Sequence, residues 1–191
     1  MEIKFLNEQA IPQAVYVARG VFDHQIRGAI MDASLTQAFD EYVNEESLRK
    51  LYLEGRLFLW GIYADGQLCA VSGMQREGHI TMLYVLPFYR KRKMGISLLK
   101  EMKRYAADVL GLDRLTVNAL PAWSAGFFQR GGFRQMDPRQ GGMSRFVCME
   151  AKIAKETTYP IKPLSEKVIV GVTSGYLGLA FLSVVLFFLI Y

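Results

Sequence analysis

The residues best suited to chemistry form a basic turn that leads into a segment of helical character. Free N–H groups and the positive end of the helix dipole favour phosphate or carboxylate groups at such a place, and a glycine lets the backbone approach a ligand closely. The sequence therefore predicts an anion site here, although such a cluster is also typical of a solvated helix face or a membrane-surface patch. The turn consists of four consecutive basic residues followed closely by a glycine: Arg90, Lys91, Arg92, Lys93 and Gly95.

One side chain near this turn could accept a proton at neutral pH. His79 lies at the start of the predicted strand that leads into the turn. An imidazole, whose ordinary pKa is about 6.5, suits the role of general base. The alternative is that His79 only begins a strand after the turn at Glu77-Gly78; Glu77 is a weaker candidate base.

The elements that would position these residues alternate between strands and helices in an α+β arrangement. Three strands separated by short turns read as an antiparallel meander. Residues 27–57 are less regular, with a short helix at 45–52. The remaining elements are a strand at 2–6, a helix at 8–26, the meander at 57–64, 68–75 and 79–86, a helix at 94–110, a strand at 115–117, a short helix at 123–130, and a closing pair at 133–135 and 145–151.

Two sequence motifs occur at matching positions in these predicted elements. The first is a strand followed by V-x-P-x-Y-R-x-x-G-x-G/A and a leucine pair, represented here by Val85, Pro87, Tyr89, Arg90, Gly95, Leu98 and Leu99. The second is F-Y-x-x-x-G-F, represented by residues 127–133. With these motifs the chain resembles the GNAT family of N-acetyltransferases. Lys93 stands where that family has its first glycine; reading Arg92, Gly95 and Ser97 as the motif would misplace the leucine pair.

The resemblance implies a GNAT acyl-CoA N-acyltransferase fold over residues 1–152, with a mixed, mostly antiparallel sheet flanked by helices. It implies transfer of an acetyl group from acetyl-CoA to a primary amine. Backbone groups of Leu83, Tyr84 and Val85 would pair with the pantetheine arm like an added strand, and Asn118 would contact the pantetheine amides. The pyrophosphate would lie on the amides of Arg90, Lys91, Arg92, Lys93, Met94, Gly95 and Ile96. His79 lies where some members carry a basic glutamate.

Phe128 departs from the family pattern and opens an alternative. Many members have a tyrosine there that protonates the departing CoA thiolate, and phenylalanine has no proton to give. Tyr84 or Tyr89 nearby, another group or water would have to serve, or the chain would be an acyl-CoA-binding sensor or adaptor without catalysis. The acceptor is not identified by the sequence, but acidic residues within 22–55 favour a cationic one.

Two other classes of function are not indicated. Cys69 and Cys148 have no spacing motif, and so imply neither a disulfide framework nor a metal site. The basic turn is short, and Phe88 and Tyr89 beside it do not form a stacking platform on a sheet, so no nucleic-acid binding is expected.

Residues 168–191 carry no charge and predict a single transmembrane helix. As a helix they would extend about 36 Å, against a hydrocarbon core of about 30 Å. Residues 153–167 would be a juxtamembrane linker, and its lysines, with Lys152, favour a cytoplasmic catalytic domain. Gly171 and Gly175 have a spacing that allows helix pairing, and hence a homodimer. The first residues lack the apolar core of a signal peptide.

Overall fold

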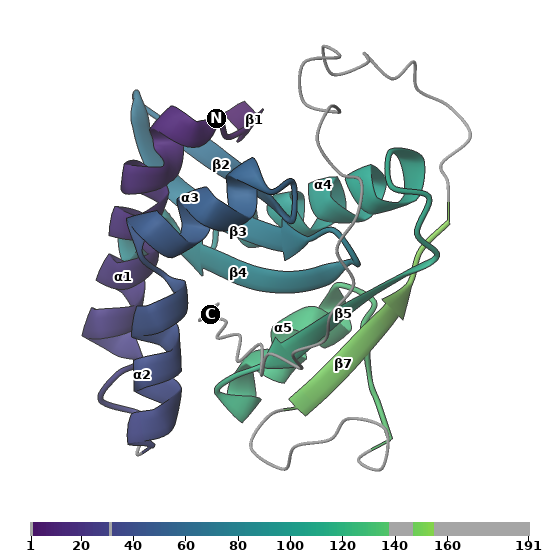
Figure 1. The fold of residues 1–191 in the computed structure, drawn as a ribbon. Coiled ribbons are helices and arrows are strands. Elements are labelled where there is room, and N and C mark those ends of the chain that lie inside the picture. The colour runs from purple at the N-terminus through teal and green to yellow at the C-terminus, as the bar shows by residue number, and fades with distance from the viewer. Residues whose placement is uncertain (1, 31, 138–146, 155–191) are drawn as a thin grey trace, which may run out of the picture.

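The computed structural model describes residues 2–30, 32–137 and 147–154 (Figure 1). In these residues the strands form one seven-stranded sheet in the order β1-β2-β3-β4-β5-β7-β6. All neighbouring pairs are antiparallel except β4 with β5, which is parallel. The strands are β1 (Glu2–Phe5), β2 (Leu57–Ala64), β3 (Gln67–Gln75), β4 (His79–Val85), β5 (Arg114–Ala119), β6 (Arg134–Gln135) and β7 (Val147–Lys152).

Helices cover both faces of this sheet. In Figure 1, α1, α2 and α3 lie together on one face of β2–β4, and α4 lies on the other. The helices are η1 (Glu8–Ala10), α1 (Ile11–Gln25), α2 (Ala33–Tyr42), α3 (Glu45–Leu53), η2 (Pro87–Tyr89), α4 (Met94–Asp108), η3 (Ala122–Ser124) and α5 (Ala125–Arg130). The predicted α+β class and the mixed, mostly antiparallel sheet are confirmed.

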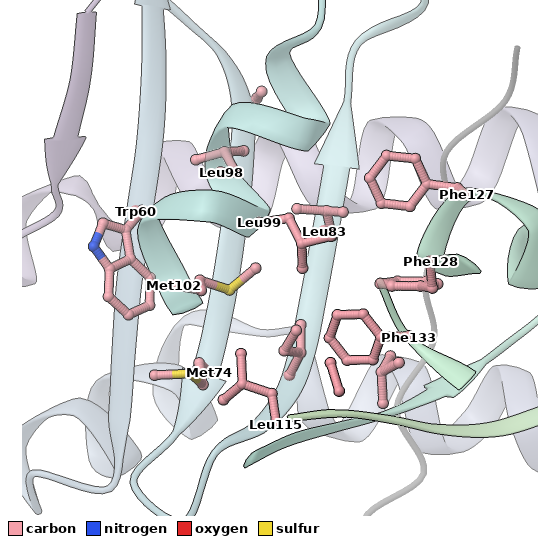
Figure 2. Close-up of a cluster of buried hydrophobic side chains, with 14 of the residues drawn as sticks. Trp60, Met74, Leu83, Leu98, Leu99, Met102, Leu115, Phe127, Phe128 and Phe133 are labelled. Carbon is pink, nitrogen blue, oxygen red and sulfur yellow. The ribbon is translucent and has the colours of Figure 1, made fainter. Parts of the chain in front are cut away.

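Each face of the sheet has its own buried cluster of apolar side chains. The cluster under α4 includes Trp60, Leu83 and Leu99 together with Phe128, and Figure 2 shows these side chains converging from β2, β4, α4 and α5. The opposite cluster joins α1, α2 and α3 to the sheet through side chains such as Phe22 and Phe39. Full burial of each such side chain contributes about 1.5–3 kcal/mol, so the sheet is held firmly from both sides.

The parallel strands β4 and β5 separate soon after they begin to pair. Their register consists of His79 opposite Thr116 and Ile80 opposite Val117. β5 continues to pair with β7 as far as Ala119, whereas β4 leads into η2 and α4. Figure 1 shows β4 and β5 diverging. The register between β3 and β4 also shifts between Gly73 and Met74. Such a bulge increases the local twist of the strands. The remainder of β4 therefore presents an unpaired edge toward β5 within the described residues.

The helix α2 was not predicted from the sequence. It begins after Asp32, whose side chain accepts a hydrogen bond from the backbone N–H of Ser34. Only two of its residues, Leu35 and Phe39, are buried apolar ones, which is too short a stripe to reveal a helical period. The side chain of Asp40 links α2 to α1 by accepting hydrogen bonds from Arg19, in α1, and Arg27, just after it.

The predicted membrane segment, residues 168–191, lies outside the described residues, as does most of the predicted linker. Among the helices of the described residues, none combines the length and the apolar character that crossing a bilayer requires.

Candidate active site

A cavity of about 580 Å³ opens where β4 turns into α4. The basic turn forms one wall, and α5 closes another with Phe127 and Arg130. Seven of the predicted cofactor-binding residues line it: Val85, Arg90, Lys91, Lys93, Met94, Gly95 and Ile96. The sequence motif and the cavity therefore coincide.

The backbone of the turn is shaped to receive an anion. Lys91 and Lys93 have φ angles of +60° and +62°, the left-handed region that residues with a Cβ rarely adopt. Lys93 thus takes the conformation that favours glycine at this place of the motif. Alternation of left- and right-handed residues directs successive N–H groups into one concavity. Within the described residues, the amides from Lys91 to Ile96 have no protein acceptor, and the first helical bond is from Ser97 N to Lys93 O at 3.0 Å.

Arg90 takes part in the site differently from the other residues of the turn. Its backbone N–H donates to Pro87 O at 3.2 Å, so this amide is engaged within the protein. Its side chain donates from Nε to Val85 O at 3.3 Å and from Nη2 to Gln25 Oε1. Partial burial lowers the pKa of the guanidinium. Arg92 lies outside the cavity lining, with its guanidinium 5.2 Å from the ring centre of Phe88.

The three predicted strand residues have different surroundings. Val85 lines the cavity, Leu83 is buried in the cluster under α4, and Tyr84 is buried in the opposite cluster. Their shared feature is the backbone, which lies along the open edge of β4. Asn118 lies on β5 beyond its last pair with β4, opposite Cys148 of β7. A ligand chain entering between β4 and β5 would therefore meet backbone groups on one side and Asn118 on the strand opposite.

His79 is partly buried at the base of the separation between β4 and β5, with its Nε2 shielded from solvent. Its Nδ1 is 2.8 Å from Thr116 Oγ1, and its Nε2 has no hydrogen-bond partner within the described part of the chain. Burial lowers the pKa of His79 to about 4, so the imidazole is neutral at pH 7. His79 is not among the residues that line the cavity, and the geometry therefore separates it from the basic turn.

Of the two candidate proton donors, Tyr84 is buried, as is Phe128, whereas Tyr89 is partly buried and lines the cavity. Tyr84 has no exposed surface and packs edge-on against Phe39, with 6.2 Å between ring centres. Burial raises the pKa of its hydroxyl well above the usual range. Phe128 is 1% exposed and packs edge-on against Phe127 and Phe133, as Figure 2 shows. It is Phe127, the neighbouring residue, that reaches the cavity.

Several residues of the cavity were not predicted as site residues. Lys100 follows the turn by less than two helical turns, and was seen only as part of the basic cluster. Phe127 and Arg130 belong to the second motif, whose spacing alone does not say which side chains face the turn. Gln25 does not line the cavity but accepts a hydrogen bond from Arg90. It is remote in sequence, and no signal in the sequence connects it with Arg90. The four residues that line the cavity beyond the predicted set are Tyr89, Lys100, Phe127 and Arg130.

The family model described as an acetyltransferase (GNAT) domain matches residues 12–153. The chain belongs to this family. Membership confirms the predicted class of enzyme, an acetyl-CoA-dependent N-acetyltransferase, and acetyl-CoA as its cofactor. No curated protein sequence shows a significant match to the chain.

Solved structures of GNAT proteins share the fold. One is the PaiA N-acetyltransferase of Thermoplasma acidophilum in complex with coenzyme A, with a TM-score of 0.63 and 19% identity over 80% of this chain and 99% of that one. Another is a GCN5-related N-acetyltransferase of Rhodopseudomonas palustris, with a TM-score of 0.64 and 18% identity over 80% and 95%. A predicted acetyltransferase of Clostridium acetobutylicum with acetyl-CoA has a TM-score of 0.58 and 16% identity over 72% and 92%. At these identities the likeness concerns the fold.

Proposed function

We propose that this GNAT protein acetylates a primary amine at a membrane surface, using the cavity at the start of α4 to hold coenzyme A. The observation that carries the placement is the coincidence, on one cavity wall, of left-handed backbone, cationic side chains and amides that have no acceptor within the described residues. A pyrophosphate needs this combination, since its charge is stabilised by N–H donors and by lysine and arginine side chains.

The residues divide the work of binding by their chemistry. The amides of Lys91 to Ile96 would hold the pyrophosphate, and Gly95 leaves room for it against the helix. Lys93, Lys100 and Arg130 add positive charge around the cavity. The open edge of β4 at Leu83 to Val85 would pair with the amides of the pantetheine arm, with Asn118 on the strand opposite. The residues present therefore fit the pyrophosphate and the pantetheine arm of coenzyme A.

The acetyl-CoA thioester supplies the acetyl group: the acceptor nitrogen bonds to the acetyl carbon, the C–S bond breaks, and the amine proton is lost to a base while the thiolate gains one. His79, as a neutral imidazole, is the proposed proton acceptor, and Tyr84 is the proposed donor. Because Tyr84 is buried and neither residue lines the cavity, water would have to link them to the reacting atoms. A CoA thiolate with a pKa near 8.5 can also depart without a donor.

The proposed membrane location is supported by sequence alone. Residues 168–191 are uncharged, and basic residues of the preceding linker favour a cytoplasmic domain. A short linker would keep the cavity near the bilayer, where a lipid head group or a membrane-protein amine could be the acceptor. Fractionation of cells would test this, because the full chain should sediment with membranes and a chain ending at residue 167 should not.

The enzymatic proposal is tested by measuring the binding of acetyl-CoA and the release of CoA thiol with panels of amines. We expect Arg90→Glu and Gly95→Val to weaken binding, the first by charge and the second by obstructing the cavity. Arg92→Glu should act in the same direction but less, since its guanidinium stacks on Phe88 and Tyr89 away from the cavity lining. Unchanged affinity in all three would contradict the placement of the site.

Phe128 favours a second candidate function. Its ring is buried and offers no hydroxyl, which is compatible with a protein that binds acetyl-CoA as a sensor or adaptor without transferring the acetyl group. Tight binding of acetyl-CoA without thiol release for any tested amine would favour this alternative.

A further inference from the structure

Arg90 is a half-buried cation whose two side-chain partners are both uncharged. It donates to the carbonyl of Val85 and to the side-chain oxygen of Gln25. Within the described residues it forms no ion pair, and desolvation is what lowers its pKa. By contrast, Arg19 and Arg27 both pair with Asp40 at distances of 2.9 and 2.7 Å. Removing a charge from water without a counter-ion is unfavourable, so the Arg90 site is best satisfied when an anion arrives.

Gln25 is suited to orient this cation without neutralising it. It is the last residue of α1 and lies 65 positions before Arg90. Its carboxamide oxygen accepts a hydrogen bond as a carboxylate would, but it adds no charge. Val85 and Gln25 bind different nitrogens of one planar guanidinium, and two such contacts fix the direction of the whole fork. The remaining donors of Arg90 stay available at the cavity that it lines.

We infer that Gln25 is a positioning residue for coenzyme A: it holds the Arg90 guanidinium at the cavity wall, where the guanidinium pairs with the pyrophosphate. The inference rests on the proposed placement of coenzyme A in this cavity. Gln25 itself does not line the cavity and acts only through Arg90. The binding site therefore draws on the end of α1 as well as on the sequence motif that contains the turn.

The experiment is calorimetric titration of the full chain with CoA, comparing replacements at position 25 with Arg90→Ala and with the double variant. Gln25→Met keeps the length of the side chain but removes the acceptor, and should raise Kd about fivefold, the net value of one ordinary hydrogen bond. Gln25→Glu should raise Kd by more than about tenfold, because a carboxylate pairs with Arg90 and repels phosphate. Gln13→Ala is the matched control, since Gln13 is an exposed glutamine of the same helix.

The double variant separates positioning from a general effect on the fold. If Gln25 acts through Arg90, Gln25→Met combined with Arg90→Ala binds CoA no more weakly than Arg90→Ala alone. The loss of affinity caused by Gln25→Met should be equal for CoA and for dephospho-CoA. Dephospho-CoA lacks the 3′-phosphate but keeps the pyrophosphate. Unfolding curves of each variant confirm that the protein tested is folded.

Three results would overturn the inference. They are parent-like affinity of Gln25→Met, an additive loss in the double variant, and a loss confined to CoA with its 3′-phosphate. Each of these leaves CoA binding by the parent intact, and so leaves the proposed function standing. Failure of the parent chain to bind CoA would instead remove the proposed function itself, and the inference with it.

Discussion

Replacing Lys93 by glycine should stabilise the fold while weakening the binding of coenzyme A. Lys93 has φ +62° and ψ +7°, and a residue with a Cβ pays about 1–2 kcal/mol for this conformation. Glycine removes that strain but gives the unfolded chain more freedom, which offsets about 0.5–1 kcal/mol. The net expectation is a gain of about 0.5–1 kcal/mol in the free energy of unfolding.

The same replacement removes one positive charge from the cavity wall. A charge pair separated by 4 Å in water is worth about 1 kcal/mol, so the Kd for CoA should rise about fivefold. Lys93→Ala is the matched control, because it loses the same charge but keeps the left-handed strain. Both variants should bind CoA equally weakly, and the loss should shrink as salt is added.

Urea unfolding of the full chain and calorimetric titration with CoA measure the two effects separately. The decisive comparison is between glycine and alanine at position 93. If Lys93→Gly is no more stable than Lys93→Ala, the backbone does not adopt the left-handed conformation, and the reasoning about the turn is refuted. Equal affinity of both variants and the parent would instead show that this side chain contributes no attraction for the cofactor.

Three further predictions concern stability, each measured by unfolding of the full chain. A Cβ at Gly131 would lie 2.4 Å from Leu99 Cδ2 and 3.2 Å from Phe128 O, so Gly131→Ala should lose about 1–3 kcal/mol of unfolding free energy. Gly20→Ala in α1, with nothing within 4 Å, should gain up to about 1 kcal/mol; a Gly131→Ala variant as stable as the parent would contradict the packing of α5 on α4. Burial lowers the pKa of His79 from 6.5 to about 4, so stability is fully present above pH 6.5 and falls by at most about 3 kcal/mol as the pH falls toward 4. His79→Gln should flatten that decline, and an unchanged dependence of stability on pH would mean that His79 is not buried. Phe128→Tyr should lose about 1–3 kcal/mol because its hydroxyl would enter the core, with the Kd for CoA unchanged; a faster acetyl transfer would show that this side chain reaches the cofactor after all.

Local signals in the sequence were sufficient for most of the fold. The turn residues Asp65 and Gly66 mark the end of β2, and its predicted range of 57–64 is the observed one. The strand, basic turn and helix that make the cavity wall were predicted for the same reason, since each depends on neighbours in the chain. The helix α2 was missed because its attachment through Asp40 is tertiary.

The rest of the site depends on how distant elements pack. Spacing placed Phe128 in the second motif, but the rotation of α5 against α4 decides that Phe127 reaches the cavity. The contact of Gln25 with Arg90 joins two segments 65 residues apart. Neither segment has a local sequence pattern that predicts this contact. The predicted base, His79, could be located on its strand, but its burial beside Thr116 follows from the pairing of β4 with β5.

The separation of β4 from β5 also bears on how long the protein survives in a cell. Within the part of the chain that the structure describes, β4 after Ile80 has no strand partner on its β5 side, and such edges invite pairing with other chains. A pantetheine arm lying there would cover the edge. Binding to the folded state alone adds about 2.7 kcal/mol of stability when free ligand is at 100 times its Kd. The supply of coenzyme A would then govern the abundance of the enzyme as well as its rate, because a depleted pool would leave more chains open to aggregation and proteolysis.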